Sequence, residues 1–361
     1  MPVGPAPASV HGVSTPPSSV PSHRSSDPAS SDPGAFDPRP AAPAVAAPGA
    51  RRAPGRNGRL TGVQLLVSVI LFLVVETLIS VIAVVWTVVT SGAVPDPSSG
   101  FGVADFDPTG FLVAAVIGAV LAITGHILVV GPIGARPGQA VGGRGKLAEL
   151  AAGLGIGSLL IALSTGIIAL LGGYRVTGLD PNPQLLAPLA IGIFAAFVEE
   201  VFFRGALLRL IDGWLGSWAA LALTSVLFGL VHITNDDAGL WGAIAIIIEA
   251  GVLLGGAYLL TRRLWLAIGI HLAWNTVQSG IFSFAVSGTG EQHGILQAQL
   301  SGPDWLSGGA MGAEGSVVTV IVGLAAGIVM VVLAHRRGNL LPRDRRADRP
   351  LTGADGTVPN A

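Results

Sequence analysis

Three ionisable side chains lie in the middle of an apolar stretch, residues 193–210, at the centre of the chain. Glu199, Glu200 and Arg204 are surrounded there by apolar residues over a length that can enter a bilayer. A charged residue at the centre of a membrane helix costs roughly 2.5–3.5 kcal/mol, so three of them require a reason. Residues four apart share a helix face, which pairs Glu200 with Arg204 and leaves Glu199 without a local partner. A free carboxylate suits general acid–base chemistry, and the structural alternative is a buried pair that orients helices.

Two further apolar stretches carry polar groups at helical spacing. Phe228 and His232 lie in one of them, and His271 and Asn275 lie in the other, one turn apart. Residues one turn apart can face a single cavity. A single histidine in a membrane helix is usually a packing residue, but two histidines, an asparagine and the two glutamates in one apolar fold favour a chemical site.

The composition indicates an integral membrane protein. Of 361 residues, 51% are hydrophobic and only 11% are charged, and the mean hydropathy is +0.68. The chain contains no cysteine, which excludes disulfides, thiolate ligands, thiol catalysis and cysteine lipidation. Any catalytic or metal site must therefore use His, Asp, Glu and neutral polar groups. No nucleic-acid partner is predicted.

The chain divides into a tail, a membrane domain and a second tail. Residues 1–59 are rich in Pro, Ala, Ser and Gly and lack periodicity, which predicts a disordered cytoplasmic tail. Residues 60–335 form an all-α polytopic membrane domain, and residues 336–361 a basic cytoplasmic tail. Because about 20 residues span the hydrocarbon core, we predict about eight transmembrane helices, at residues 63–89, 111–130, 147–171, 185–208, 218–233, 240–260, 264–284 and 317–334.

The charges in the loops predict the orientation. Basic residues fall in alternate connections, which should therefore face the cytoplasm: Arg136, Arg144, Lys146, Arg209, Arg262, Arg263 and the residues from Arg336 onward. The other connections are mostly acidic, and only Arg175 departs from the rule. The pattern predicts a multi-pass protein of the cell membrane with both termini in the cytoplasm.

Several other features have structural interpretations. Gly153 and Gly157, and likewise Gly251 and Gly255, are interpreted as close helix contacts. The Gly-rich outer loop, residues 285–316, is interpreted as a mobile connector, with a lid as the alternative. Three single polar groups in apolar segments are expected to make interhelical hydrogen bonds, with a functional role as the alternative: Glu76, His126 and Glu249.

The polar groups form three motifs that resemble those of the CPBP intramembrane proteases, a family that includes the CAAX prenyl endopeptidases and the bacteriocin-processing or Abi proteins. They occur in the family's order on three apolar segments: EExxxR at Glu199, Glu200 and Arg204, FxxxH at Phe228 and His232, and HxxxN at His271 and Asn275. Each motif alone is weak, whereas the ordered set is specific. The resemblance covers about residues 147–284, a protease-like core, and leaves out the N-terminal tail and the last apolar segment.

The resemblance implies an endopeptidase that hydrolyses a peptide bond of a membrane-associated peptide or protein. It makes Glu199 the base that activates water, with His232 helping to hold that water. It makes His271 and Asn275 the groups that stabilise the oxyanion. The expected partners are the lipid bilayer and the peptide or membrane-protein substrate.

The same resemblance makes Glu200 and Arg204 a supporting pair and leaves the cofactor open. One Glu and two His, here Glu199 or Glu200 with His232 and His271, make a set like those of catalytic zinc sites with an open water position. A metal-free glutamate mechanism is equally compatible with the motifs. Both a metallo-type and a glutamate-type peptidase are therefore expected possibilities, with Glu199, His232 and His271 as the metal ligands of the first.

Two other functions are compatible with charges inside a membrane. A proton-coupled transporter would use them as an ion relay, although inverted repeats with broken helices in matching halves are not evident in the sequence. A non-catalytic scaffold or immunity protein would keep the fold in order to bind a partner membrane protein. Counterflow in proteoliposomes identifies a transporter. A scaffold is identified by motif mutations that leave the phenotype intact, whereas mutations on the outer helix faces remove it.

Overall fold

The computed structural model describes residues 58–92, 105–133 and 140–342. The predicted disordered tail lies outside these residues except for its last two positions, which begin the first helix. The predicted C-terminal tail lies outside them from residue 343 onward.

Seven helices among the described residues are long and apolar enough to cross a membrane, which makes this a multi-pass membrane protein. Most large apolar side chains on their outer faces are exposed, as expected where lipid covers them. The helical elements that form these spans are α1 (Gly58–Ser91), α2 (Pro108–Ile133), α3 (Lys146–Leu170), the run from α4 (Leu186–Phe194) to α5 (Arg209–Leu215), α6 (Ser217–Val231), the run from α7 (Gly239–Ile246) to α8 (Val252–Thr261), and α11 (Val317–Arg336).

The eighth predicted span is the exception. Residues 264–284 form α9 (Trp265–Gly280), which has 16 residues and falls short of the about 20 needed to cross the hydrocarbon core unaided. Most of its residues are buried, so protein rather than lipid surrounds it. The structure thus gives seven candidate spans where the sequence predicted eight, because α9 is a central helix enclosed by the others.

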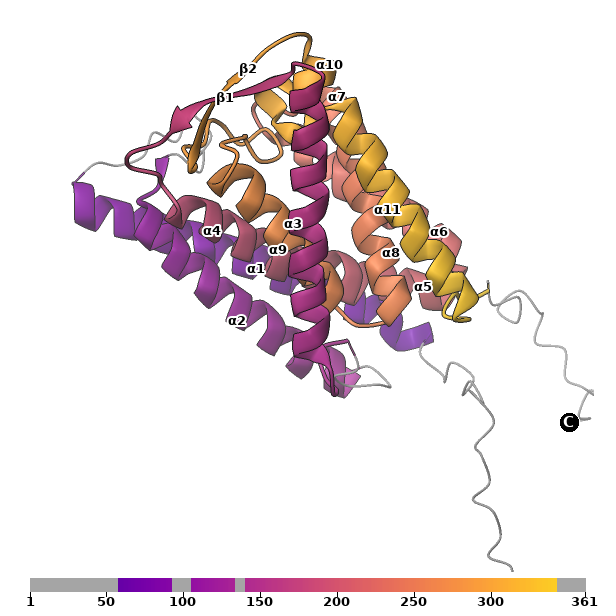
Figure 1. The fold of residues 1–361 in the computed structure, drawn as a ribbon. Coiled ribbons are helices and arrows are strands. Elements are labelled where there is room, and N and C mark those ends of the chain that lie inside the picture. Colours follow the sequence, from indigo (N-terminus) through magenta and orange to yellow (C-terminus); the bar gives the residue numbers. More distant parts are fainter. Residues whose placement is uncertain (1–57, 93–104, 134–139, 343–361) are drawn as a thin grey trace, which may run out of the picture. The chain divides into compact units, whose positions relative to one another are not determined.

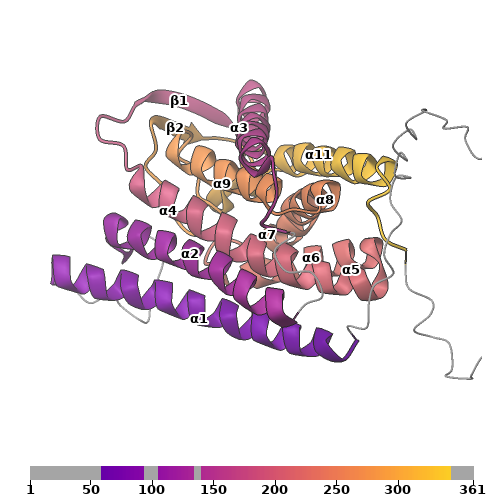
Figure 2. The same ribbon diagram turned by 90° about the horizontal axis from the view of Figure 1, so that it is seen from below.

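The helices around α9 are held by close backbone contacts. α3 packs along α9, α1 packs along α2, and α8 packs along α11 (Figure 1, Figure 2). A side chain at Gly153 would place its Cβ 2.5 Å from the backbone oxygen of Leu266, and one at Gly157 would lie 2.4 Å from that of Ile270. The prediction that these glycines mark helix contacts is confirmed, and the contacts hold α3 against the helix that carries His271.

One end of the bundle, here called the arginine end, gathers basic residues predicted to face the cytoplasm. They bind partners on other elements: Arg209 donates to Gln64 (2.9 Å), Arg262 pairs with Asp212 and donates to the backbone oxygen of Asn339 (3.0 Å), and Arg263 donates to Glu149 (3.0 Å). Gln64 lies near the start of α1 and Asn339 follows α11, so these two parts of the chain meet at the same end. The first described helix therefore begins at the end of the bundle where the last one finishes.

The opposite end, here called the ribbon end, carries two short strands that the sequence analysis did not predict. β1 (Tyr174–Leu179) pairs antiparallel with β2 (Leu296–Leu300), with a bulge between Val176 and Gly178. Tyr174 donates from its hydroxyl to the backbone oxygen of Phe282 (3.0 Å), and burial raises the pKa of Tyr174 to about 12. The ribbon therefore ties the segment after α3 to the loop after α9.

The outer loop is folded over the ribbon end. It contains β2 and the short helices α10 (Asp304–Ser307), η7 (Gly309–Met311) and η8 (Ala313–Gly315), and several of its side chains are buried. Trp241 of α7 donates to the backbone oxygen of Gly315 (2.8 Å), and Asn235 donates to that of Ser287 (2.7 Å). The loop is therefore packed onto the bundle, and its role as a mobile connector or as a lid stays a prediction.

Candidate active site

The helix that carries the EExxxR motif is not a regular α-helix throughout. Between α4 and α5 lie two π-helical segments, η3 (Ala195–Glu199) and η4 (Val201–Leu208). A π turn forms hydrogen bonds five residues apart instead of four, and such turns occur frequently at functional sites. The wider turn changes the direction in which neighbouring side chains point, and here it includes Glu199 and Arg204 of the motif.

Glu200 and Arg204 form the ion pair that their spacing predicted. Nη1 of Arg204 donates to Oε1 of Glu200 at 2.6 Å, and both side chains are buried, at 2% and 0% exposure. Nη2 of Arg204 donates to the backbone oxygen of Ala250 (3.3 Å), and the guanidinium carbon lies 4.3 Å from the centre of the Phe228 ring. The buried positive charge is thus met by a carboxylate, a carbonyl and an aromatic face.

Glu200 also contacts the third motif. Nδ1 of His271 lies 2.9 Å from the same Oε1 atom that accepts from Arg204. An ionised carboxylate has no hydrogen to donate, so the hydrogen of this contact lies on Nδ1. In a protonated ring, Nε2–H is then a second donor that can stabilise a developing negative charge.

The two histidines line one small cavity. His232 is the first residue of the short helix η5 (His232–Thr234), where its Nδ1 donates to the backbone oxygen of Phe228 (2.6 Å). The Phe228 ring centre lies 4.9 Å from that of His232 and 6.0 Å from that of His271. The second motif therefore places an aromatic ring between its own histidine and that of the third motif, and most of the remaining wall is apolar.

Glu199 and Asn275 do not line this cavity. Oε2 of Glu199 and Oδ1 of Asn275 are buried, and neither has a hydrogen-bond partner among the described residues. The structure thus brings together Glu200, Arg204 and His271 by direct contact and adds His232 through the shared cavity. Glu199 and Asn275, the other two polar residues of the predicted site, each keep a buried oxygen without a hydrogen-bond partner among the described residues.

The predicted zinc ligands are not assembled in the described residues. No three His, Asp or Glu side chains there lie close enough together to hold a metal ion. His271 contacts Glu200, and His232 turns its Nδ1 to a backbone oxygen. The side chains as they stand do not fit a zinc site, and a metal-dependent mechanism remains a proposal that requires a glutamate to reach both histidines.

Glu199 lies close to a carboxylate of α1. Phe72 of α1 stacks on Phe202 with ring centres 4.4 Å apart, and Gln64 of α1 accepts from Arg209. Residue numbers thus rise along α1 as they fall along the helical run from α4 to α5, here called the motif helix, so the two helices are antiparallel. About one turn beyond the stacked rings, Glu76 of α1 lies level with Glu199 of the motif helix. The two carboxyl groups interact electrostatically. Among the described residues the side chain of Glu76 makes no hydrogen bond, and its polar neighbour there is the carboxyl group of Glu199.

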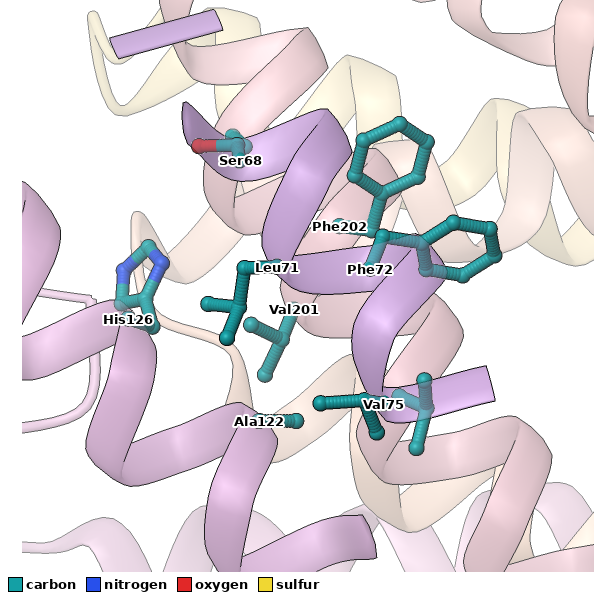
Figure 3. Close-up of a pocket in the computed structure, with 10 residues that line it drawn as sticks. Ser68, Leu71, Phe72, Val75, Ala122, His126, Val201 and Phe202 are labelled. Atoms are coloured by element: carbon teal, nitrogen blue, oxygen red, sulfur yellow. The ribbon is translucent and has the colours of Figure 1, made fainter. Parts of the chain in front are cut away.

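A second small cavity lies beside this contact, between α1, α2 and the helical run from α4 to α5. Figure 3 shows Phe72 and Val75 of α1 facing it together with Val201 and Phe202, and His126 of α2 at its edge. Its lining is almost entirely apolar.

Glu249, the third single polar group, is fully buried on the other side of the bundle, where neither carboxylate oxygen has a partner among the described residues.

Sequence reasoning missed two polar residues of the histidine cavity. Ser287 and Glu314 of the outer loop line it beside His271 and Trp274. Glu314 is buried, and its carboxylate accepts three hydrogen bonds. The only signal for it was an acidic residue in a Gly-rich loop, with no spacing that relates it to the motifs.

The fold and the three joined motifs define a multi-pass membrane protein with a buried Glu–Arg–His network. Residues 181–277 match the family model described as Type II CAAX prenyl endopeptidase Rce1-like. This segment contains all three motifs and confirms the resemblance to the CPBP and Abi proteins there: the chain carries an Rce1-like domain. Neither a curated protein nor a solved structure matches the chain.

Proposed function

We propose that this protein is an intramembrane endopeptidase that hydrolyses a peptide bond of a membrane-associated peptide or protein. The observation that carries the proposal is the 2.9 Å contact between Glu200 and His271, which joins the first and third motifs inside the bundle. The family match over residues 181–277 supports it, since that family consists of proteases. The shared cavity of His232 and His271 supports it further, because it brings the histidines of the second and third motifs to one place.

The proposed chemistry assigns Glu199 as the general base. Glu199 does not line the cavity of His232 and His271 in this conformation, so the proposal requires its side chain to turn toward that cavity. Its carboxylate then takes a proton from a water molecule held with the help of His232, and the water oxygen bonds to the carbonyl carbon of the substrate. The carbonyl oxygen becomes negative, and N–H groups of His271 and Asn275 stabilise it. When the intermediate collapses, the carbon–nitrogen bond breaks and the leaving nitrogen takes the proton from Glu199.

The pair of Glu200 and Arg204 has a supporting role in this proposal. Arg204 neutralises Glu200 at 2.6 Å, and the same Glu200 oxygen holds Nδ1 of His271, which leaves Nε2 as the ring atom available to the oxyanion. Removal of one oxyanion donor costs about 10²- to 10³-fold in rate in other enzymes. A similar loss is expected when His271 is replaced.

The substrate proposed is a peptide segment that is largely apolar. Apart from the histidines, Ser287 and Glu314, the cavity wall is formed by apolar side chains of α6 to α9. Such a wall suits apolar side chains flanking the scissile bond. Whether a prenyl group is required is tested by comparing one quenched fluorescent peptide with and without a farnesylated C-terminal cysteine.

The test of the function is cleavage of those peptides by purified protein in proteoliposomes. We expect Glu199→Ala to abolish cleavage while the protein remains inserted and folded. Glu149→Ala is the matched control, because Glu149 is a partly exposed glutamate at the arginine end whose role is to pair with Arg263. Cleavage by Glu199→Ala at the wild-type rate would exclude this mechanism, and transport of ions without cleavage by the wild type would favour the transporter.

A further inference from the structure

Glu314 of the outer loop connects three parts of the molecule through one buried carboxylate. Its Oε1 accepts from the indole Nε1 of Trp274 at 3.1 Å. Its Oε2 accepts from the backbone nitrogen of Ser287 at 2.6 Å and from the Ser287 hydroxyl at 2.9 Å. The side chain is only 3% exposed, so these bonds replace the water that the carboxylate loses on burial.

The position of Trp274 makes this contact relevant to the site. Trp274 lies on α9 between His271 and Asn275, and its side chain is buried. The three residues fall within about one and a quarter helical turns. The direction of the indole therefore fixes how this part of α9 is rotated about its helix axis. Because α9 is only 16 residues long and enclosed by protein, side-chain contacts such as this one hold it in place.

The same carboxylate closes the cavity at the ribbon end. Glu314, Ser287 and Trp274 all line the cavity together with His232 and His271. Ser287 has a backbone φ of 50°, in the left-handed region that non-glycine residues rarely adopt, and its nitrogen points to Glu314 in this conformation. Strained backbone is kept where surrounding contacts fix it, and the two bonds from Ser287 to Glu314 are such contacts.

We propose that Glu314 is a positioning residue of the hydrolytic site, which orients the turn containing His271 and Asn275 through Trp274 and holds the outer loop across the cavity through Ser287. This inference rests on the proposed endopeptidase function. It extends the site beyond the segment that matches the family model, residues 181–277, into the outer loop.

The chain offers a matched control for the test. Trp241 of α7 donates its indole Nε1 to the backbone oxygen of Gly315 at 2.8 Å, next to Glu314 in the same loop. Trp241 does not line the cavity and does not contact α9 through this bond. Trp241→Phe and Trp274→Phe each remove an indole hydrogen bond to one of two adjacent loop residues, from an exposed ring in the first variant and from a buried ring in the second. Only Trp274→Phe removes a bond to the helix of His271.

The experiment measures kcat and KM for the quenched peptide cleaved best by the wild type, in proteoliposomes. We expect Trp274→Phe and Glu314→Gln each to lower kcat about tenfold with KM changed less than twofold, and Trp241→Phe to keep kcat within twofold of the wild type. The double variant W274F/E314Q should be slower than E314Q alone by less than the factor that Trp274→Phe costs by itself, because the two changes act on a shared contact. Glu314→Asp, which keeps the charge and both acceptor oxygens, should retain more activity than Glu314→Gln.

Other outcomes overturn the proposal. Equal losses of kcat in Trp241→Phe and Trp274→Phe would show that loop anchoring alone matters, and wild-type kcat in Trp274→Phe would show that the contact does not position the site. If Glu314→Gln cannot be purified folded, the two tryptophan variants still decide, because both keep an aromatic ring in place. A wild type that cleaves no peptide, or Glu199→Ala that cleaves as the wild type does, would instead refute the proposed function.

Discussion

Oε1 of Glu200 accepts from Nη1 of Arg204 at 2.6 Å and lies 2.9 Å from Nδ1 of His271, so one buried carboxylate oxygen joins two motifs that lie 71 residues apart in the chain. Its other oxygen, Oε2, is buried without a partner among the described residues. The carboxylate is therefore fixed by its charge pair and its histidine alone, and replacement of any of the three disturbs the other two.

Glu200→Ala is expected to destabilise the protein strongly. It leaves the Arg204 guanidinium buried without its counter-charge, and breaking a buried ion pair in this way costs about 3–5 kcal/mol. Thermal unfolding of the purified variant in detergent measures the effect. Glu149→Ala breaks the Arg263–Glu149 pair, whose side chains are 24% and 19% exposed, and should lower the unfolding temperature far less. Equal shifts in the two variants would contradict a special role of the buried pair.

The parts of the site that the sequence predicted depend on short spacings. The Glu200–Arg204 pair follows from two residues one turn apart, and the contacts of Gly153 and Gly157 follow from small residues four apart on an apolar helix. Seven of the eight predicted spans are confirmed as candidate spans, because lipid contact requires a long apolar run, which can be recognised without knowing the neighbouring helices.

The parts that the sequence did not predict depend on contacts between distant residues. α9 is an apolar segment of only 16 residues, and its enclosure by other helices cannot be recognised from the segment itself. The π-helical segments around Glu199 and Glu200 depart from the regular spacing on which the helical-face argument relies. Glu314 binds Trp274 across 40 residues, and no local pattern indicates such a contact.

Gly153→Ala is expected to lower both stability and cleavage. A Cβ there would lie 2.5 Å from the backbone oxygen of Leu266 and 2.8 Å from the Cα of Gly269, so α3 and α9 must separate. Gly155→Ala is the matched control, because a Cβ at Gly155 meets no atom within 4 Å and alanine favours the helix by about 1 kcal/mol. Unfolding temperature and kcat should fall in the first variant and be unchanged or slightly higher in the second. An equal response at both positions would refute close packing of α3 on α9.

Glu76→Leu is expected to raise the unfolding temperature. Glu76 lies on an otherwise apolar helix beside Glu199, and two carboxyl groups in such surroundings are mutually unfavourable when charged. Leucine removes both the like charge and the cost of a carboxyl group in a membrane helix, where a charged residue costs roughly 2.5–3.5 kcal/mol. Glu291→Leu, in the outer loop, is the control and should not stabilise the protein. A lower unfolding temperature for Glu76→Leu would mean that the carboxyl of Glu76 makes a stabilising contact.

Removal of metal ions is expected to leave cleavage unchanged. The reason is the arrangement of the side chains: no three His, Asp or Glu groups of the described residues lie within reach of one ion, and His271 is held by Glu200 instead. Cleavage of the quenched peptide should persist after incubation with 1,10-phenanthroline and dialysis, and elemental analysis of the purified protein should find less than one zinc per chain. Cleavage that is lost on chelation and restored by zinc would show that Glu199 or Glu200 moves to join both histidines, and would replace the glutamate mechanism by a metal-dependent one.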